Sequence, residues 1–156
     1  MMSRILRVAV CLVVCVGAAP ALAQLPGMQI EGQTAPGERD PESVIRDQLD
    51  AFNAHAADAM TANLHEQFAW FAVDSNVMTL EMEGRGTFRD SMVQYFRALP
   101  SARAELQDVV VAGNFVTTIE RAYWVQNGVE TSQASLAVYE IRNGLIYRVW
   151  YYPAYE

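Results

Sequence analysis

Lysine is absent from this chain of 156 residues, and all 11 of its basic residues are arginine. The absence excludes a Schiff-base lysine and the lysine of a nucleotide-binding P-loop. Basic charge of any kind is scarce, because 18 acidic residues give the chain a formal net charge of -7 at pH 7. An acidic chain with no basic run is poorly suited to nucleic acid, so we expect no nucleic-acid partner.

The chain has only two cysteines, and both lie in an N-terminal segment with the pattern of a secretory signal peptide. Arg4 and Arg7 precede the apolar run Val8–Val16, and Ala21-Leu22-Ala23 fits the small-x-small cleavage pattern. The run is shorter than the ~20 residues that span a membrane. We therefore predict a signal peptide over residues 1–23, a periplasmic or secreted product, and no membrane partner once the segment is removed.

The expected mature chain begins at Gln24 and holds no cysteine and only two histidines, His55 and His65. It can form no disulfide, and it offers neither a thiol nucleophile nor a thiolate metal site. The two histidines are ten residues apart, and no third residue completes a ligand-like spacing. We therefore expect no metal and no cofactor.

Residues 24–39 mix proline and glycine with polar residues and show no periodicity, which predicts a flexible linker before a domain at 40–156. Asp40 can cap a helix that starts at Pro41, and apolar residues follow at helical spacing. A second, shorter helix is indicated near residues 59–64, which places His65 at its C-terminal end.

The rest of the chain has the pattern of strands with one further helix. Apolar and aromatic residues predict a hairpin of strands near 67–73 and 77–83, then a helix over 87–99 with Thr87 and Asp90 as a capping box. Two-residue turns separate the strands that follow, at 106–112, 115–125, 130–141 and 145–152; the first turn is Gly113-Asn114 and the other two are Asn-Gly pairs. The order α-α-β-β-α-β-β-β-β predicts an α+β fold, in which a strongly curved, mostly antiparallel sheet wraps the helices as a cone-shaped barrel.

Several short stretches accompany this order over residues 42–152, namely Leu49–Ala54 with Asp58, Gly84–Phe88, Gly113–Val116 and Ala137–Trp150. Together with the order of elements, they resemble the SnoaL-like families of the nuclear transport factor 2-like superfamily, whose members include ketosteroid isomerase and scytalone dehydratase. The family's usual glycine after the first helix is missing, and Ala54-His55-Ala56 stands in its place.

The resemblance implies a cone with a mostly apolar pocket, often in a homodimer, but it implies no particular reaction. Ketosteroid isomerase-like relatives use a carboxylate base on the first hairpin strand, with a tyrosine and a protonated aspartic acid as the oxyanion hole. The matching positions here are Ala72, Gln48 and Ala137, and none of them can do that chemistry. Whether the protein is an enzyme therefore stays open.

Three residues are candidates for a non-standard acid or base, with a structural or surface role as the alternative for each. His65 is expected near the pocket mouth. Glu120 stands in mid-strand, where a charge is costly unless it points into the cone or into an interface. Glu140 stands on the last hairpin, and Arg142, two residues along on the same face, is its expected partner.

An apolar ligand pocket is expected to be lined by Trp70, Tyr123, Tyr139, Val149 and Tyr151. Val149 and Tyr151 share a face of the last strand because side chains alternate along it. A two-residue turn at Asn143-Gly144 pairs Tyr139 with a residue on the other face, so Tyr139 joins them only if a bulge shifts the register. The pocket should bind a small apolar molecule.

The same alternation predicts that Ile146, Arg148 and Trp150 share the opposite face of the last strand, which we expect to form a homodimer interface. Glu140 and Arg148 fall on opposite faces in this register. The sequence thus favours an exported SnoaL-like domain that binds a small apolar or amphipathic molecule. The alternatives are a proton-transfer enzyme (isomerase, dehydratase or hydrolase) and a protein-association module that uses its sheet face.

Overall fold

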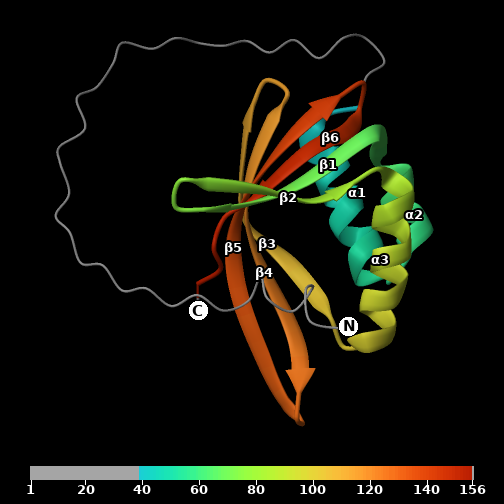
Figure 1. Ribbon diagram of the computed structural model, residues 1–156, viewed down its shortest axis with the longest axis vertical. Coiled ribbons are helices and arrows are strands. Elements are labelled where there is room, and N and C mark those ends of the chain that lie inside the picture. Colours follow the sequence, from blue (N-terminus) through green and yellow to red (C-terminus); the bar gives the residue numbers. More distant parts are fainter. Residues whose placement is uncertain (1–38, 156) are drawn as a thin grey trace, which may run out of the picture.

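The computed structural model describes residues 39–155, so the expected signal peptide and all of the expected linker except Arg39 lie outside the described residues. The elements follow the predicted order (Figure 1). The helices are α1 (Pro41–Asn53), α2 (Ala57–Ala62) and α3 (Arg85–Ala98). The strands are β1 (Leu64–Asp74), β2 (Val77–Glu83), β3 (Arg103–Ala112), β4 (Phe115–Gln126), β5 (Val129–Arg142) and β6 (Leu145–Tyr151).

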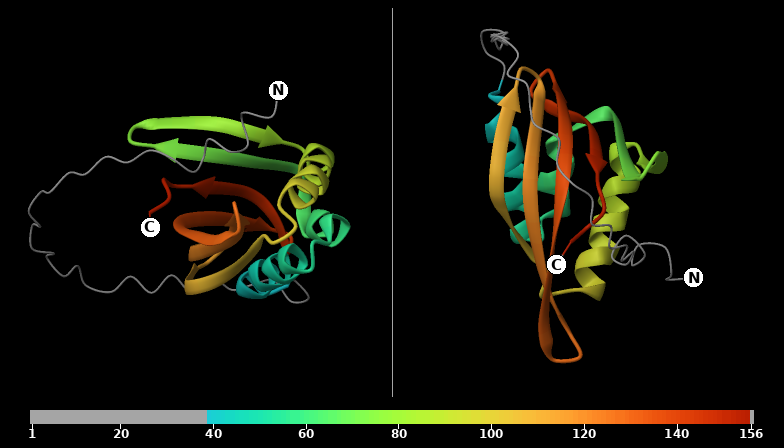
Figure 2. Two further views of the ribbon diagram at one scale, coloured as in Figure 1. Left: turned by 90° about the horizontal axis from the view of Figure 1, so that it is seen from below. Right: turned by 90° about the vertical axis from the view of Figure 1, so that its left-hand side faces the viewer.

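The strands form one sheet with the order β2-β1-β6-β5-β4-β3. Neighbouring strands are antiparallel except β1 and β6, which run parallel. The sheet is strongly curved, and the three helices cover one of its faces (Figure 2). The α+β prediction is confirmed, although β2 and β3 stay at the two edges and do not close the sheet into a barrel.

Helix α1 begins as the sequence predicts. The Asp40 carboxylate accepts a hydrogen bond from the Ser43 backbone N–H at 3.0 Å, and Pro41 occupies the first turn, where it loses no helical hydrogen bond. Val44 and Ile45 are almost fully buried and face the sheet. The core lies between the helices and the sheet, so the face that meets the helices is here called the inner face and the other the outer face.

The turn between α1 and α2 contains His55 with φ of 53°, in the left-handed region that glycine favours. The imidazole compensates for this conformation with two contacts. It stacks on Phe96 at 4.4 Å between ring centroids, and its Nε2 lies 2.7 Å from the carbonyl oxygen of Ala102. Histidine therefore replaces the family's usual glycine here and also ties the turn to α3 and to the start of β3.

Two local predictions are wrong. Helix α2 ends at Ala62 and β1 begins at Leu64, so His65 is a strand residue and not the end of a helix. The chain leaves the helix early because Asn63 is buried and its carbonyl accepts a hydrogen bond from Ile146 of β6. Helix α3 begins at Arg85 after Gly84, whose φ is 82°, and no side chain caps it, so the capping box at Thr87 does not form.

A bulge shifts the pairing of β5 and β6. Next to the turn the register is the one that a two-residue turn predicts, with Ile141 opposite Ile146. Beyond the bulge, Tyr139 is opposite Val149 and Glu140 is opposite Arg148. Tyr139 therefore shares the inner face with Val149, as the pocket hypothesis required.

The same bulge overturns two other predictions. Ile146 is only 1% exposed and lies on the inner face, so it cannot belong to an outer surface with Arg148 and Trp150. Glu140 and Arg148 are directly opposed and therefore share the outer face, where the uninterrupted register had separated them. One extra residue in β6 thus changes which side chains meet on either side of the sheet.

Candidate functional site

A carboxylate with two tyrosines lies on the inner face of the sheet, and this cluster is our candidate site. Tyr139 of β5 donates a hydrogen bond to Oε1 of Glu120 at 2.6 Å, and Tyr151 of β6 donates one to Oε2 at 2.7 Å. Thr118, two residues before Glu120 on β4, donates to Oε1 at 2.7 Å. The two phenolic oxygens are 2.8 Å apart. Three strands thus bring four oxygen-bearing side chains together.

The protonation of the two tyrosines is set by their surroundings. Burial of the hydroxyl raises the pKa of Tyr139 well above the usual tyrosine range, and the charge of Glu120 raises it further. The same two causes, in the same order, raise the pKa of Tyr151. Both hydroxyls therefore keep their protons at neutral pH, and both serve as donors to the carboxylate.

The cluster lies among aromatic and aliphatic side chains. The indole of Trp70 on β1 is 5.2 Å from the ring of Tyr151, and Val149, directly opposite Trp70, is buried. Met82 and Leu106 are half-buried and pack against the same core. Glu120 itself is half-buried, so it is a partly accessible charged group in an otherwise apolar setting.

Four of the five predicted pocket residues share this inner face, and Tyr123 does not. Tyr123 is three residues from Glu120 on the same strand, so alternation turns it to the outer face. Its hydroxyl donates to Glu105 of β3 at 2.5 Å, and the Arg103 guanidinium lies 3.8 Å from the centre of its ring. Tyr123 and Glu105 thus form a second tyrosine–glutamate pair, solvent-exposed and on the opposite face from the candidate site.

The other two acid–base candidates lie apart from Glu120. Glu140 is on the outer face and accepts a hydrogen bond from Nε of Arg142 at 2.6 Å, as its spacing predicted. His65 accepts a hydrogen bond at Nδ1 from the backbone N–H of Gln67 at 3.1 Å, and its ring meets Tyr147 edge to face at 5.2 Å. Of the three candidates, only Glu120 lies with the predicted ligand-binding aromatics.

Thr118 was not foreseen as part of the site. A signal for it exists in the sequence, because Thr118 and Glu120 are two apart and must share a face if the segment is a strand. The nearly complete burial of Thr118, 1% exposed, is the unusual feature, since its hydroxyl needs a partner there and finds it in the carboxylate.

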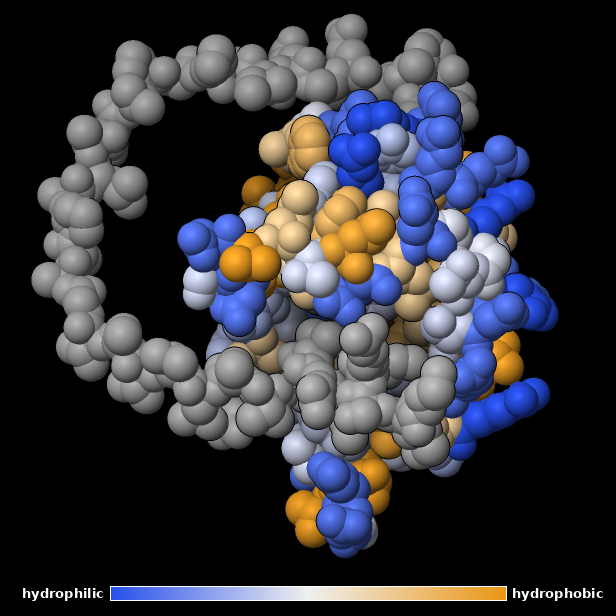
Figure 3. Space-filling model, in the orientation of Figure 1, coloured by the Kyte–Doolittle hydropathy of each residue, from blue (hydrophilic) through white to orange (hydrophobic). Residues whose placement is uncertain are grey.

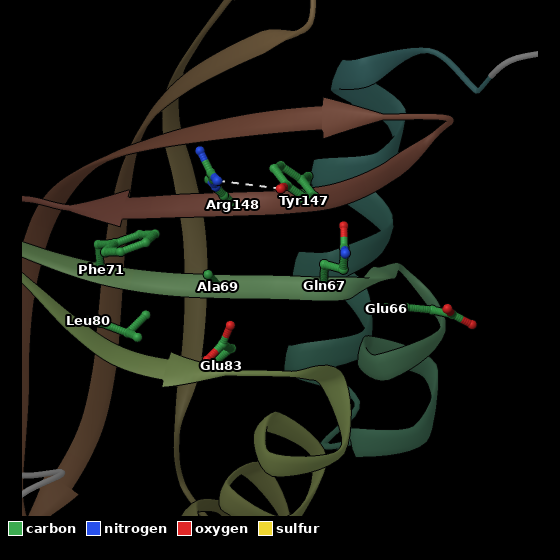
Figure 4. Close-up of a pocket in the computed structure, with 8 residues that line it drawn as sticks. All are labelled: Glu66, Gln67, Ala69, Phe71, Leu80, Glu83, Tyr147 and Arg148. Carbon is green, nitrogen blue, oxygen red and sulfur yellow. Dashed lines mark hydrogen bonds between the residues drawn. The ribbon is translucent and has the colours of Figure 1, made fainter.

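A groove of about 390 Å³ lies on the outer face over β1, β2 and β6 (Figure 4). Ala69 forms its floor, because this small residue is directly opposite both Arg148 and Glu83 in the sheet. Phe71 closes one end of the groove and stacks on Trp150 at 6.0 Å. The groove is therefore separated from the Glu120 cluster by the sheet.

Apolar side chains also project from two hairpin tips. Val77 and Met78 at the β1–β2 turn are 57% and 59% exposed, and Val129 at the β4–β5 turn is 65% exposed. Figure 3 shows hydrophobic atoms at both tips, beside hydrophilic ones. The β4–β5 hairpin extends well beyond the helices (Figure 1).

Within residues 39–155, no three His, Cys, Asp or Glu side chains gather closely enough to hold a metal ion. The helices of this part of the chain are too short and too polar to cross a membrane.

The fold and the sheet topology define a nuclear transport factor 2-like domain. The chain belongs to the SnoaL-like domain family, which matches residues 45–149. No curated protein matches the chain.

Solved structures share this fold. An uncharacterized cystatin fold protein from Novosphingobium aromaticivorans is 18% identical, with a TM-score of 0.63 over 72% of this chain and 97% of that one. A nuclear transport factor 2-like protein of unknown function from Cytophaga hutchinsonii is 18% identical, with a TM-score of 0.57 over 72% and 88%. A candidate polyketide cyclase from Xanthomonas campestris pv. campestris is 26% identical, with a TM-score of 0.55 over 74% and 90%.

Proposed function

We propose that this SnoaL-like domain binds a small, largely apolar molecule on the inner face of its sheet. The molecule packs against Trp70 and Tyr151 and turns one polar group toward Glu120. The observation that carries the proposal is the half-buried carboxylate of Glu120, held by three hydroxyl donors among aromatic side chains.

The energetics of the cluster support a functional role. Taking a carboxylate out of water is costly, and an apolar residue at position 120 would fill the same inner-face position without that cost. Three donors offset part of the cost, and a charged group retained in such a setting is typical of a binding or catalytic site. The similarity to a candidate polyketide cyclase, at 26% identity, favours an aromatic or polyketide-like molecule as the ligand.

Binding can be tested by isothermal titration calorimetry with 1-naphthol, a small aromatic alcohol. Trp70→Leu removes the aromatic wall beside Tyr151 and should weaken binding by tenfold or more. Phe71→Leu is the matched control, because Phe71 is the next residue of β1 and faces the outer groove. Equal affinities in the two variants, or no binding to the wild type, would contradict the proposal.

A second candidate function is proton transfer with Glu120 as the base. The observation in its favour is that Oε2 accepts one hydrogen bond and can still take a proton from a substrate. The family positions for this chemistry carry no acid here, since Ala72 and Ala137 are apolar and Gln48 accepts a hydrogen bond from Asn63. A Glu120 mechanism would therefore differ from that of ketosteroid isomerase.

Proton abstraction can be measured as exchange of the C1 hydrogens of 2-tetralone in D2O by proton NMR. Glu120 would take a C1 proton, and the electron pair of that C–H bond would form the enolate, which then takes up deuterium. The wild type should exchange these hydrogens faster than buffer does, and Glu120→Gln should reduce the rate to that of buffer. Glu105→Gln, on the outer face, should leave the rate unchanged. Equal rates in wild type and Glu120→Gln would refute a base at this position.

We also propose that the chain is exported after cleavage behind Ala23, on the sequence pattern alone. The intact mass of the exported protein tests this, and a product that keeps its two cysteines would refute it.

The proposed dimer uses the outer face of β6, with Arg148 and Trp150 but without Ile146. Trp150 is half-buried in the single chain and stacks on Phe71, so a partner would cover an aromatic surface that already exists. Trp150→Ala should shift sedimentation equilibrium toward the monomer. A wild-type protein that is monomeric at tens of micromolar would exclude this interface.

A further inference from the structure

We infer that the ligand presents a hydroxyl donor, a phenol or an enol, to Oε2 of Glu120, and that ketones and ethers of the same size bind less tightly. The inference rests on the proposed function and names the polar group of its ligand. It follows from an inventory of donors and acceptors in the cluster.

The two carboxylate oxygens differ in how many hydrogen bonds they already accept. Oε1 accepts two, from Thr118 at 2.7 Å and from Tyr139 at 2.6 Å, which uses both of its in-plane lone pairs. Oε2 accepts one, from Tyr151 at 2.7 Å. One lone pair therefore remains, and it belongs to Oε2.

The cluster has no proton to spare for a ligand. The hydroxyl of Tyr139 and that of Tyr151 each carry one proton, and both protons point to Glu120. When both tyrosine protons point to Glu120, no proton lies between the two phenolic oxygens, which are 2.8 Å apart. Every polar atom of the cluster that is still open to a ligand is thus an acceptor.

A ligand carbonyl could bind here only by drawing one tyrosine proton away from Glu120. That exchange would leave a carboxylate oxygen with one donor fewer in an apolar setting, which is unfavourable. A ligand hydroxyl has no such cost, because it donates to the open position on Oε2 and leaves the existing hydrogen bonds in place. An ether of the same shape fills the same space but provides no donor.

Three naphthalenes separate these cases by isothermal titration calorimetry: 1-naphthol, 1-methoxynaphthalene and 1-acetonaphthone. In the wild type, 1-naphthol should bind at least tenfold more tightly than the ether or the ketone, which corresponds to one hydrogen bond of about 1.4 kcal/mol. In Glu120→Gln this preference should fall to about twofold or less. Glu105→Gln removes the matched carboxylate of the outer pair and should keep the wild-type preference.

Tyr151→Phe provides a second test that does not depend on Glu120→Gln being folded. It removes the donor to Oε2, so the preference for 1-naphthol should persist or increase, and the ketone should stay weak. If Tyr151 donated its proton to the ligand instead, the ketone would lose affinity in this variant.

The outcomes separate the inference from the proposed function. Binding of the ketone or the ether as tight as that of 1-naphthol refutes the donor assignment and leaves the binding site in place. A preference for 1-naphthol that survives in Glu120→Gln refutes Oε2 as the acceptor. Failure of all three compounds to bind refutes the inference and the proposed function together.

Discussion

Raising the pH above 10 should destabilise this protein through Tyr139 and Tyr151. Both have pKa values raised well above the ordinary 10.0, first by burial and then by Glu120. In the unfolded chain the two tyrosines lose their protons near pH 10, whereas in the folded chain they keep them to higher pH. The stabilisation is therefore fully present below pH 10 and is lost progressively as the pH rises toward the folded-state values. Each tyrosine should lower the free energy of unfolding by about 1.4 kcal/mol per pH unit in that range.

Urea unfolding followed by circular dichroism between pH 8 and pH 11.5 measures this slope. The absence of lysine simplifies the experiment, because no amine side chain titrates in the same range. Tyr139→Phe should reduce the slope by about 1.4 kcal/mol per pH unit, and Tyr151→Phe should do the same. Tyr155→Phe, which alters an exposed ring, controls for the loss of a tyrosine as such. A wild-type stability that stays constant to pH 11.5, or a slope unchanged in both inner-face variants, would refute the placement of these hydroxyls beside a carboxylate.

Three further predictions concern the edges of the domain. Asp40→Ala removes the cap of α1 and should lower the free energy of unfolding by ~1 kcal/mol in urea, whereas Asp40→Asn should nearly preserve it. A chain that begins at Asp40 should be less stable than one that begins at Arg39, because Arg39 donates to the buried Asn63 at 3.1 Å; equal melting temperatures would show that this contact contributes nothing. Gly144→Ala should cost ~1 kcal/mol or more, since φ is 69° and an added Cβ would lie 3.2 Å from Arg39, and a neutral substitution would contradict this turn geometry.

The order of elements could be predicted from the sequence because turn residues mark where one strand ends and the next begins. Asn127 and Asn143 take positive φ, each followed by a glycine that does the same, so the last two hairpins turn where the Asn-Gly pairs predict. Pro41 and Asp40 set the start of α1 in the same direct way. The boundaries of α2 and β1 could not be read, because the early end of α2 depends on a hydrogen bond from the distant Ile146.

Only part of the candidate site was predicted from the sequence, and the reason is the register in which the strands pair. The turn at Asn127-Gly128 pairs β4 with β5 without interruption, so Thr118 is opposite Ala137 and Glu120 is opposite Ser135. Counting outward from that turn would have placed Glu120 and Tyr139 on one face and Tyr123 on the other. The sequence therefore contained enough information to exclude Tyr123 from the pocket and to add Thr118 to it.

The contribution of β6 could not be obtained by counting, because it depends on the bulge. With the uninterrupted register of the Asn143-Gly144 turn, Tyr139 would be opposite Arg148, and Tyr151 would lie on the outer face. The extra residue of β6 moves Tyr151 opposite Ala137, on the inner face, from where its hydroxyl reaches Glu120. Two hairpins with different registers are thus required to assemble one cluster: the regular pairing of β4 and β5 positions the carboxylate and its first tyrosine, and the bulge supplies the second. Deletion of Tyr147, the extra residue, should therefore merge the two registers into one continuous pairing in which Tyr151 stays opposite Ala137 and keeps its hydrogen bond to Oε2. A crystal structure of the deletion variant with Tyr151 on the outer face would refute this account of the bulge.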